Sequence, residues 1–129
     1  MNVRPLKGVR AVREAFAGPL RVRSGPVAAV GSRGPASSTV SYVVVVAKHR
    51  MPRAVDRNRV KRLLRESLRM AARSHQALRP TSNLSTIVVR WQSAHARGLE
   101  LSVVANHVQV VIDRLLAVAA PTDAAGGGE

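Results

Sequence analysis

The sequence predicts a single-domain α+β protein whose elements follow the order α-β-β-β-α-β-α. Its 129 residues are 46% hydrophobic, which is enough for one domain with a buried core. The segment Val40–Ala47 is an almost continuous β-branched run, typical of a central strand covered on both faces. Two later segments, 56–74 and 103–119, instead carry apolar residues at helical spacing.

The first half of the chain begins with a short helix and continues as strands. In 7–17 the apolar residues fall on one side, and a Gly-Pro pair ends the helix. The short segments 20–23 and 26–30 are strand candidates separated by Ser-Gly. Residues 31–38 are rich in Gly, Ser and Pro, so we expect a loop before the strand 40–47.

The second half alternates helix, strand and helix. Asp56 is a good N-cap for the long helix that runs to about Ser74. Residues 85–91 form a second strong strand candidate, between predicted loops at 79–84 and 94–99, and Ser102 is expected to cap the last helix.

The end of the chain, residues 120–129, is a glycine-rich stretch of low complexity that we expect to be disordered. The folded domain is therefore expected to span 1–119.

The long helix predicted after Asp56 has an almost entirely cationic polar face. A stripe at i, i+4 spacing, with two further residues in the same arc, consists of Arg57, Lys61, Arg65, Arg69 and Arg73, with Asn58 and Arg62. Like charges at this spacing destabilise a helix by about 0.2–0.5 kcal/mol per pair, and cations in the first turn oppose the helix dipole. A polyanionic partner is the simplest explanation of this face.

The overall charge agrees with such a partner. The chain has 21 Lys and Arg against 7 Asp and Glu, a formal net charge of +14, and the segment 48–73 holds ten of the cations with only two acids. This balance indicates a nucleic acid, an anionic membrane surface or an acidic protein as partner. The absence of cysteine excludes disulfides and thiolate chemistry. No apolar run long enough to span a membrane and no signal peptide are apparent, so we expect a cytoplasmic protein without a membrane partner.

The chain shows no pattern typical of a catalytic or metal site. Its seven acids are scattered, and its four histidines share no ligand spacing. We therefore expect no catalytic residue and no metal ligand among the protein side chains.

The motif Arg57-Asn58-x-x-Lys61-Arg62-x-x-Arg65 resembles the signature of the protein component of bacterial ribonuclease P. Its surroundings agree. Val46-Ala47-Lys48-His49 resembles the family's Val-Ser-Lys-Lys/Arg, and Arg53-Ala54-Val55-Asp56 resembles its basic-Ala-Val segment. The resemblance covers about residues 6–118.

The resemblance implies an α/β sandwich like the second domain of ribosomal protein S5, with a left-handed βαβ crossover that departs from the usual right-handed rule. It implies a subunit that binds a catalytic RNA and the 5′ leader of precursor tRNA, with no protein partner required. The endonucleolytic removal of the leader would be carried out by the RNA and Mg²⁺ ions held mainly by that RNA.

Site residues follow from the resemblance position by position. Contacts to the catalytic RNA are implied for Arg57, Asn58, Arg59, Lys61, Arg62, Arg65 and Arg69, with Lys48 and Arg53 extending the surface. A leader-binding cleft between the first helix and the sheet is implied for Phe16, Tyr42 and Val12, the last standing where the family commonly has an aromatic. The strand at 27–30 also lacks the family's aromatic, so leader binding should depend more on arginine than on stacking.

Two other classes stay open at this level. A structural, ribosomal-type RNA-binding protein would share the charge and even the fold without a role in cleavage. A membrane-surface or acidic-partner helix would explain the amphipathic segment, although its apolar face lacks Trp and Phe. A DNA-binding helix fits the charge, but no helix-turn-helix arrangement accompanies it.

Overall fold

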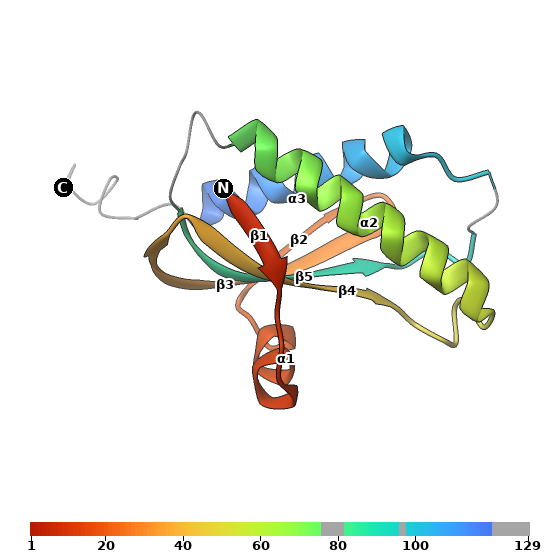
Figure 1. Cartoon of the computed structure of the whole chain (residues 1–129), viewed down its shortest axis with the longest axis horizontal. Coiled ribbons are helices and arrows are strands. Elements are labelled where there is room, and N and C mark those ends of the chain that lie inside the picture. The colour runs from red at the N-terminus through yellow and green to blue at the C-terminus, as the bar shows by residue number, and fades with distance from the viewer. Residues whose placement is uncertain (76–81, 96–97, 120–129) are drawn as a thin grey trace.

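The computed structural model describes residues 1–75, 82–95 and 98–119, which form one mixed sheet and three helices (Figure 1). In chain order the elements are β1 (Asn2–Pro5), α1 (Val9–Phe16), β2 (Leu20–Ser24), β3 (Val27–Ser37), β4 (Thr39–Val46), α2 (Ala54–His75), β5 (Ser82–Trp91) and α3 (Leu101–Val118). The α+β class and the order of the seven predicted elements are confirmed. The short strand β1 precedes them and was not predicted.

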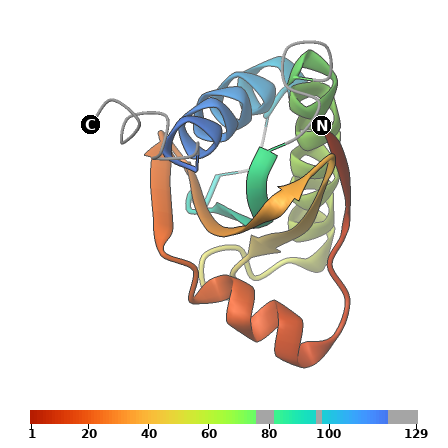
Figure 2. The same ribbon diagram turned by 90° about the vertical axis from the view of Figure 1, so that its left-hand side faces the viewer.

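The five strands lie in the order β1-β4-β5-β3-β2. β1, β4 and β5 are parallel to one another, whereas β3 is antiparallel to both β5 and β2. Helix α2 connects the parallel neighbours β4 and β5. In Figures 1 and 2 the path rises from β4 to α2 and returns to β5 on the side away from β1, which makes this crossover left-handed.

The helices cover the two faces of the sheet unequally. α2 and α3 lie on one face, and α1 crosses the opposite face (Figure 2). The main core lies under α2 and α3 and includes the fully buried side chains of Val60, Leu64, Leu68, Val104, Val108 and Ile112. The apolar stripe of α2 was predicted to face the core, and this is confirmed.

Strand alternation assigns each strand residue to one of these faces. In β4, Val40, Tyr42 and Val46 belong to the core under α2 and α3, whereas Val43 and Val45 pack with the smaller cluster beneath α1. That smaller cluster is centred on Ala15, Val30 and Val88. We call the side that carries it the α1 face of the sheet.

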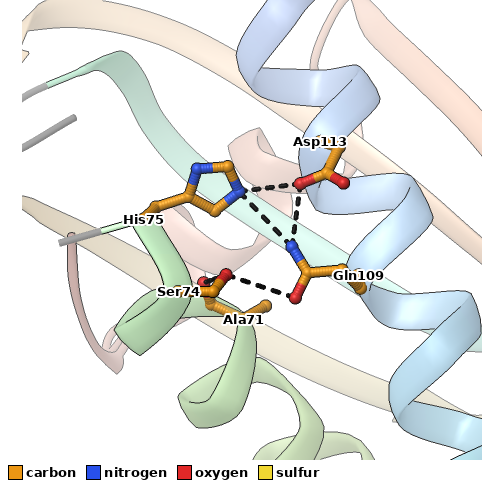
Figure 3. A network of polar contacts seen from close by, with 5 residues as sticks. All are labelled: Ala71, Ser74, His75, Gln109 and Asp113. Atoms are coloured by element: carbon orange, nitrogen blue, oxygen red, sulfur yellow. Dashed lines mark hydrogen bonds and ion pairs between the residues drawn. The ribbon is translucent and has the colours of Figure 1, made fainter. Parts of the chain in front are cut away.

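A polar network joins the end of α2 to the middle of α3 (Figure 3). His75 Nε2 lies 2.7 Å from Asp113 Oδ1, and Gln109 Nε2 donates a hydrogen bond of 2.8 Å to the same oxygen. The hydroxyl of Ser74 donates to the carbonyl of Ala71 and approaches Gln109 Oε1 at 3.3 Å. These contacts hold the end of α2 against α3.

Helix α3 corrects one sequence argument. By length and composition it is apolar enough to cross a membrane, although no sufficiently long apolar run was expected. Six of its side chains are buried against the sheet and α2, so its composition is explained by a place in the core.

Two predicted helix caps are wrong. α2 begins at Ala54, so Asp56 lies inside the first turn, where its negative charge still suits the helix dipole. α3 begins at Leu101 after the N-cap residue Glu100, and Ser102 lies within the helix. In both cases the helix starts before the polar residue that the sequence favours as a cap.

The predicted loop at 31–38 is also wrong for most of its length. β3 continues through Ser37 because its backbone pairs with β5, with register shifts after Ser32 and after Arg33. β5 in turn begins at Ser82 rather than at residue 85. Of the other predicted irregular segments, residues 79–81, 96–97 and 120–129 lie outside the described residues.

Candidate nucleic-acid interface

The N-terminal end of α2 lies where the parallel strands β4 and β5 finish (Figure 1). β4 ends at Val46, a basic connection follows, and α2 begins at Ala54. The connection carries the exposed side chains of Lys48, Arg50 and Arg53. The fold therefore places these cations directly beside the first turns of the cationic helix.

Six of the predicted site residues are exposed or half-exposed in this region. Within the described part of the chain, no hydrogen bond or ion pair engages the side chains of Lys48, Arg53, Asn58, Lys61, Arg62 and Arg65. We call these six residues the cationic face. Because the main-core side of α2 packs on the sheet, the cationic face points toward solvent with its charges unneutralised, which is the arrangement that a polyanion can occupy.

Arg69 differs slightly from these residues. Its guanidinium lies 3.9 Å from a carboxylate oxygen of Glu66, and the two side chains are 54% and 41% exposed. An ion pair this long and this exposed contributes little to stability. Arg69 is therefore free to exchange Glu66 for a stronger anion.

Arg57, the first arginine of the motif, is bound to the protein's own backbone. Its Nη1 donates hydrogen bonds to the carbonyl oxygens of Met51 at 3.0 Å and Pro52 at 2.6 Å. Met51 is buried, so Arg57 ties the basic connection to the first turn of α2. This position suits a brace for the cationic face, and a direct RNA contact by Arg57 stays a prediction.

Arg59 is bound in a similar way on another side of the helix. Its Nη2 donates a hydrogen bond of 2.9 Å to the carbonyl of Leu99, just before α3. Arg59 thereby links the starts of α2 and α3. The resemblance implied an RNA contact for Arg59, whereas this hydrogen-bond partner, forty residues away in the chain, was not predicted.

The second part of the site lies on α1. Val9, Val12, Arg13 and Phe16 share one side of the helix and, with Gly8, line an open depression of about 520 Å³. Val9 is 77% exposed although it is apolar. Phe16 also packs against the cluster that contains Val43 and Val45, so the depression borders the α1 face of the sheet. The structure thus brings together two of the three residues predicted for the cleft, Val12 and Phe16.

Tyr42, the third predicted cleft residue, is not brought to this surface. It is only 6% exposed and belongs to the core under α2 and α3. The reason is strand alternation, because Tyr42 precedes Val43, which faces α1, and must point to the opposite side. Trp91 is buried in the same core, and within the described chain its Nε1 has no hydrogen-bond partner.

Sequence analysis missed a group of residues at the end of β5. Arg90 lies with Val45, His49, Arg50 and Gln92 around a small recess at the ends of β4 and β5. Arg50 Nη1 donates to the carbonyl of Gln92 at 2.8 Å and closes one side of it. The strand pattern of residues 87–91 could have indicated Arg90, because it is the one polar residue there and stands between the apolar residues Val89 and Trp91.

The described residues contain no group of three His, Asp or Glu side chains that could hold a metal ion. What they do contain is a group of unpaired cations at the start of α2 and, on the other side of the sheet, an apolar depression along α1 that includes Phe16. This combination is typical of a nucleic-acid-binding α+β protein, in which cations contact phosphates and apolar or aromatic side chains contact bases.

The chain belongs to the ribonuclease P family, whose family model, described as Ribonuclease P, matches residues 5–115. None of the curated proteins compared with the chain matches it. Family membership makes the chain an RNA-binding protein of tRNA processing and a subunit of an endoribonuclease, associated with the ribonuclease P RNA and a tRNA substrate. The assignment made from the signature motif is confirmed.

Proposed function

We propose that the chain assists a catalytic RNA in the removal of the 5′ leader from precursor tRNA by binding both the RNA and the leader. The observation that carries this proposal is the cationic face, where six neighbouring polar side chains have no partner within the described chain. A family of ribonuclease subunits gives this surface an obvious polyanion to bind. The face would bind the catalytic RNA through its phosphates.

The role of the protein would be mainly electrostatic. Precursor tRNA and catalytic RNA repel each other through their phosphates, and a basic protein between them screens that repulsion. Arg62 and Arg65 offer planar forks suited to two phosphate oxygens, whereas Lys61 offers a compact charge. Arg57 and Arg59 would hold this surface in shape through their hydrogen bonds to backbone carbonyls.

The leader would lie along α1 and the α1 face of the sheet. A single strand is held by a basic groove with a platform for stacking, and this region offers Arg13 beside Phe16. Val9 and Val12 would give the bases an apolar wall. Tyr42 has no part in this proposal because its side chain lies in the core.

The hydrolysis itself would belong to the RNA, with Mg²⁺ held mainly by that RNA. Metal-bound water is the usual nucleophile for phosphodiesters, and the described protein residues bring no three metal-ligating side chains together. No further protein would be needed, and a cytoplasmic location would agree with the processing of tRNA.

Cleavage of precursor tRNA by a bacterial ribonuclease P RNA at low Mg²⁺ tests the proposal. The wild-type protein should restore 5′ cleavage, and the Lys61→Ala/Arg65→Ala double variant should not, because both substitutions remove unpaired charges from the cationic face. The control is Arg33→Ala/Arg114→Ala, which removes two exposed charges beside α3, outside both this face and the leader path along α1. A wild-type protein that binds the RNA but leaves cleavage unchanged would instead be a structural RNA-binding protein.

A further inference from the structure

A row of four residues crosses the α1 face of the sheet at the end where β4 and β5 finish. Pairing places Val45 of β4 beside Arg90 of β5, Arg90 beside Ala28 of β3, and Ala28 beside Arg23 of β2. Val45 packs with the cluster beneath α1, so its cross-strand neighbours face the same side. The row thus alternates apolar and cationic side chains across four strands.

The buried packing of helix α1 is centred on the neighbouring row of the sheet. Its buried residue Ala15 packs with Val30 and Val88, which form the next row along the strands. Phe16, one position further along α1, packs against the cluster that includes Val45. Through Val45 the row therefore adjoins the same cluster as Phe16, the last residue of α1.

Arg90 is the unusual member of the row. It is half-buried, and among the described residues it makes no hydrogen bond and no ion pair. Its neighbour Ala28 projects only a methyl group, so the surface beside the guanidinium is low and open. On the other side it borders the recess with His49 and Arg50. No acidic side chain lines this recess beside Arg90.

A half-buried guanidinium without an acid is unfavourable for the protein alone, because it loses hydration and gains no ionic partner. A structural role in the strand would be served better by an apolar residue, as at Val45 and Val88 in the same two strands. An incoming phosphate would give the missing ionic partner. A nucleobase could also lie on the guanidinium plane, where the small side chain of Ala28 leaves space.

We propose that Arg90, on the low floor formed with Ala28, is the platform for one nucleotide of the single-stranded leader. Its guanidinium plane stacks on the base and its charge faces the adjoining phosphate, while Phe16 marks the α1 side of the same path. This proposal rests on the proposed function, since it names the residue that recognises the leader. It explains how a chain with only 2% aromatic residues can hold single-stranded RNA.

The test compares Arg90→Ala, Arg90→Lys and Arg33→Ala in the holoenzyme reconstituted with a bacterial ribonuclease P RNA. Affinity is measured for two precursor tRNAs, one with a leader of several nucleotides and one with a single leader nucleotide. Arg90→Ala should weaken binding of the long-leader substrate about tenfold, as expected for one stacked base, and leave the short-leader substrate unchanged. Arg90→Lys should restore only part of the loss, because it keeps the charge without the plane. Arg33→Ala removes an exposed charge beside the end of α3, on the opposite side of the sheet, and should leave the ratio of the two affinities unchanged.

A second measurement separates stacking from phosphate binding. Single abasic nucleotides placed along the leader should weaken binding to the wild type at one or two positions, and this penalty should vanish in Arg90→Ala. Equal weakening of both substrates by Arg90→Ala, no weakening of either, or an abasic penalty that persists in Arg90→Ala would overturn the proposal. A wild-type protein that fails to support cleavage would refute the proposed function itself, which is a different result.

Discussion

The guanidinium of Arg57 donates a hydrogen bond of 2.6 Å to the carbonyl oxygen of Pro52 and thereby joins the helix to the segment that precedes it. A second bond, to the carbonyl of buried Met51, extends this link. The first arginine of the signature motif thus shapes the surface on which the later cations stand. A loss of function in Arg57→Ala would combine the loss of an RNA contact with the loss of this link, and a measurement of stability separates the two.

Arg57→Ala should lower the free energy of unfolding by about 1–2 kcal/mol, because two hydrogen bonds from a charged donor to backbone carbonyls are lost. Thermal or urea unfolding of the free protein measures this change. Arg62→Ala is the matched control, since it removes an exposed arginine without a partner in the described chain and should leave stability unchanged. Equal stability of the two variants would show that the bonds from Arg57 do not brace the helix start.

Arg62→Ala and Arg65→Ala should each weaken binding to the catalytic RNA and reduce the slope of log K against log salt by about 1, because each removes one phosphate contact. Titrations of the RNA at several salt concentrations measure the slope. The Arg114→Ala variant serves as the control, because Arg114 lies on α3 and donates its hydrogen bond to the carbonyl of Arg23. An unchanged slope in either α2 variant would place that residue outside the RNA contact.

Phe16→Ala should affect leader binding, whereas Tyr42→Ala should affect the stability of the fold. Tyr42 is buried in the main core, so its truncation should destabilise the fold by about 3–5 kcal/mol, with no preference for leader length among the molecules that remain folded. Phe16 is half-buried beside the α1 depression, so Phe16→Ala should weaken binding of long-leader substrates selectively. Unfolding curves and leader-length comparisons measure the two effects. A leader-specific defect in the conservative variant Tyr42→Phe would contradict the place of Tyr42 in the core.

Sulfate or phosphate should raise the melting temperature of the free protein more than chloride does at equal ionic strength. The formal net charge is +14 and the cationic face has no internal counterions among the described residues, so bound anions relieve repulsion in the folded state. Differential scanning fluorimetry or calorimetry measures the shift. The Lys61→Ala/Arg65→Ala variant should show a smaller response to sulfate, and an identical response would place the anion elsewhere.

The local patterns of the sequence predicted much of this molecule. Val40–Ala47 and the apolar stripe of α2 are strong periodic signals, and both elements are present. The boundaries were less predictable, because pairing partners and not composition decide where β3 ends and where β5 begins. Residues 33–37 join β3 although they contain Gly and Pro, since β5 lies alongside them. The strand β1 has only four residues, too few for a periodic signal.

The cationic face of α2 could also be predicted from the sequence, because residues of one helix keep a set angular spacing wherever the helix packs. By itself the sequence determined the charge of α2, the core side of that helix and the family to which the chain belongs. The tertiary structure alone decided which cations are free, since the carbonyls of Pro52 and Leu99 reach Arg57 and Arg59 only after folding. It also decided that Tyr42 is buried and that Arg90 lies beside Ala28. The reason is that strand pairing and helix packing determine which face of a strand is covered and which residues are neighbours.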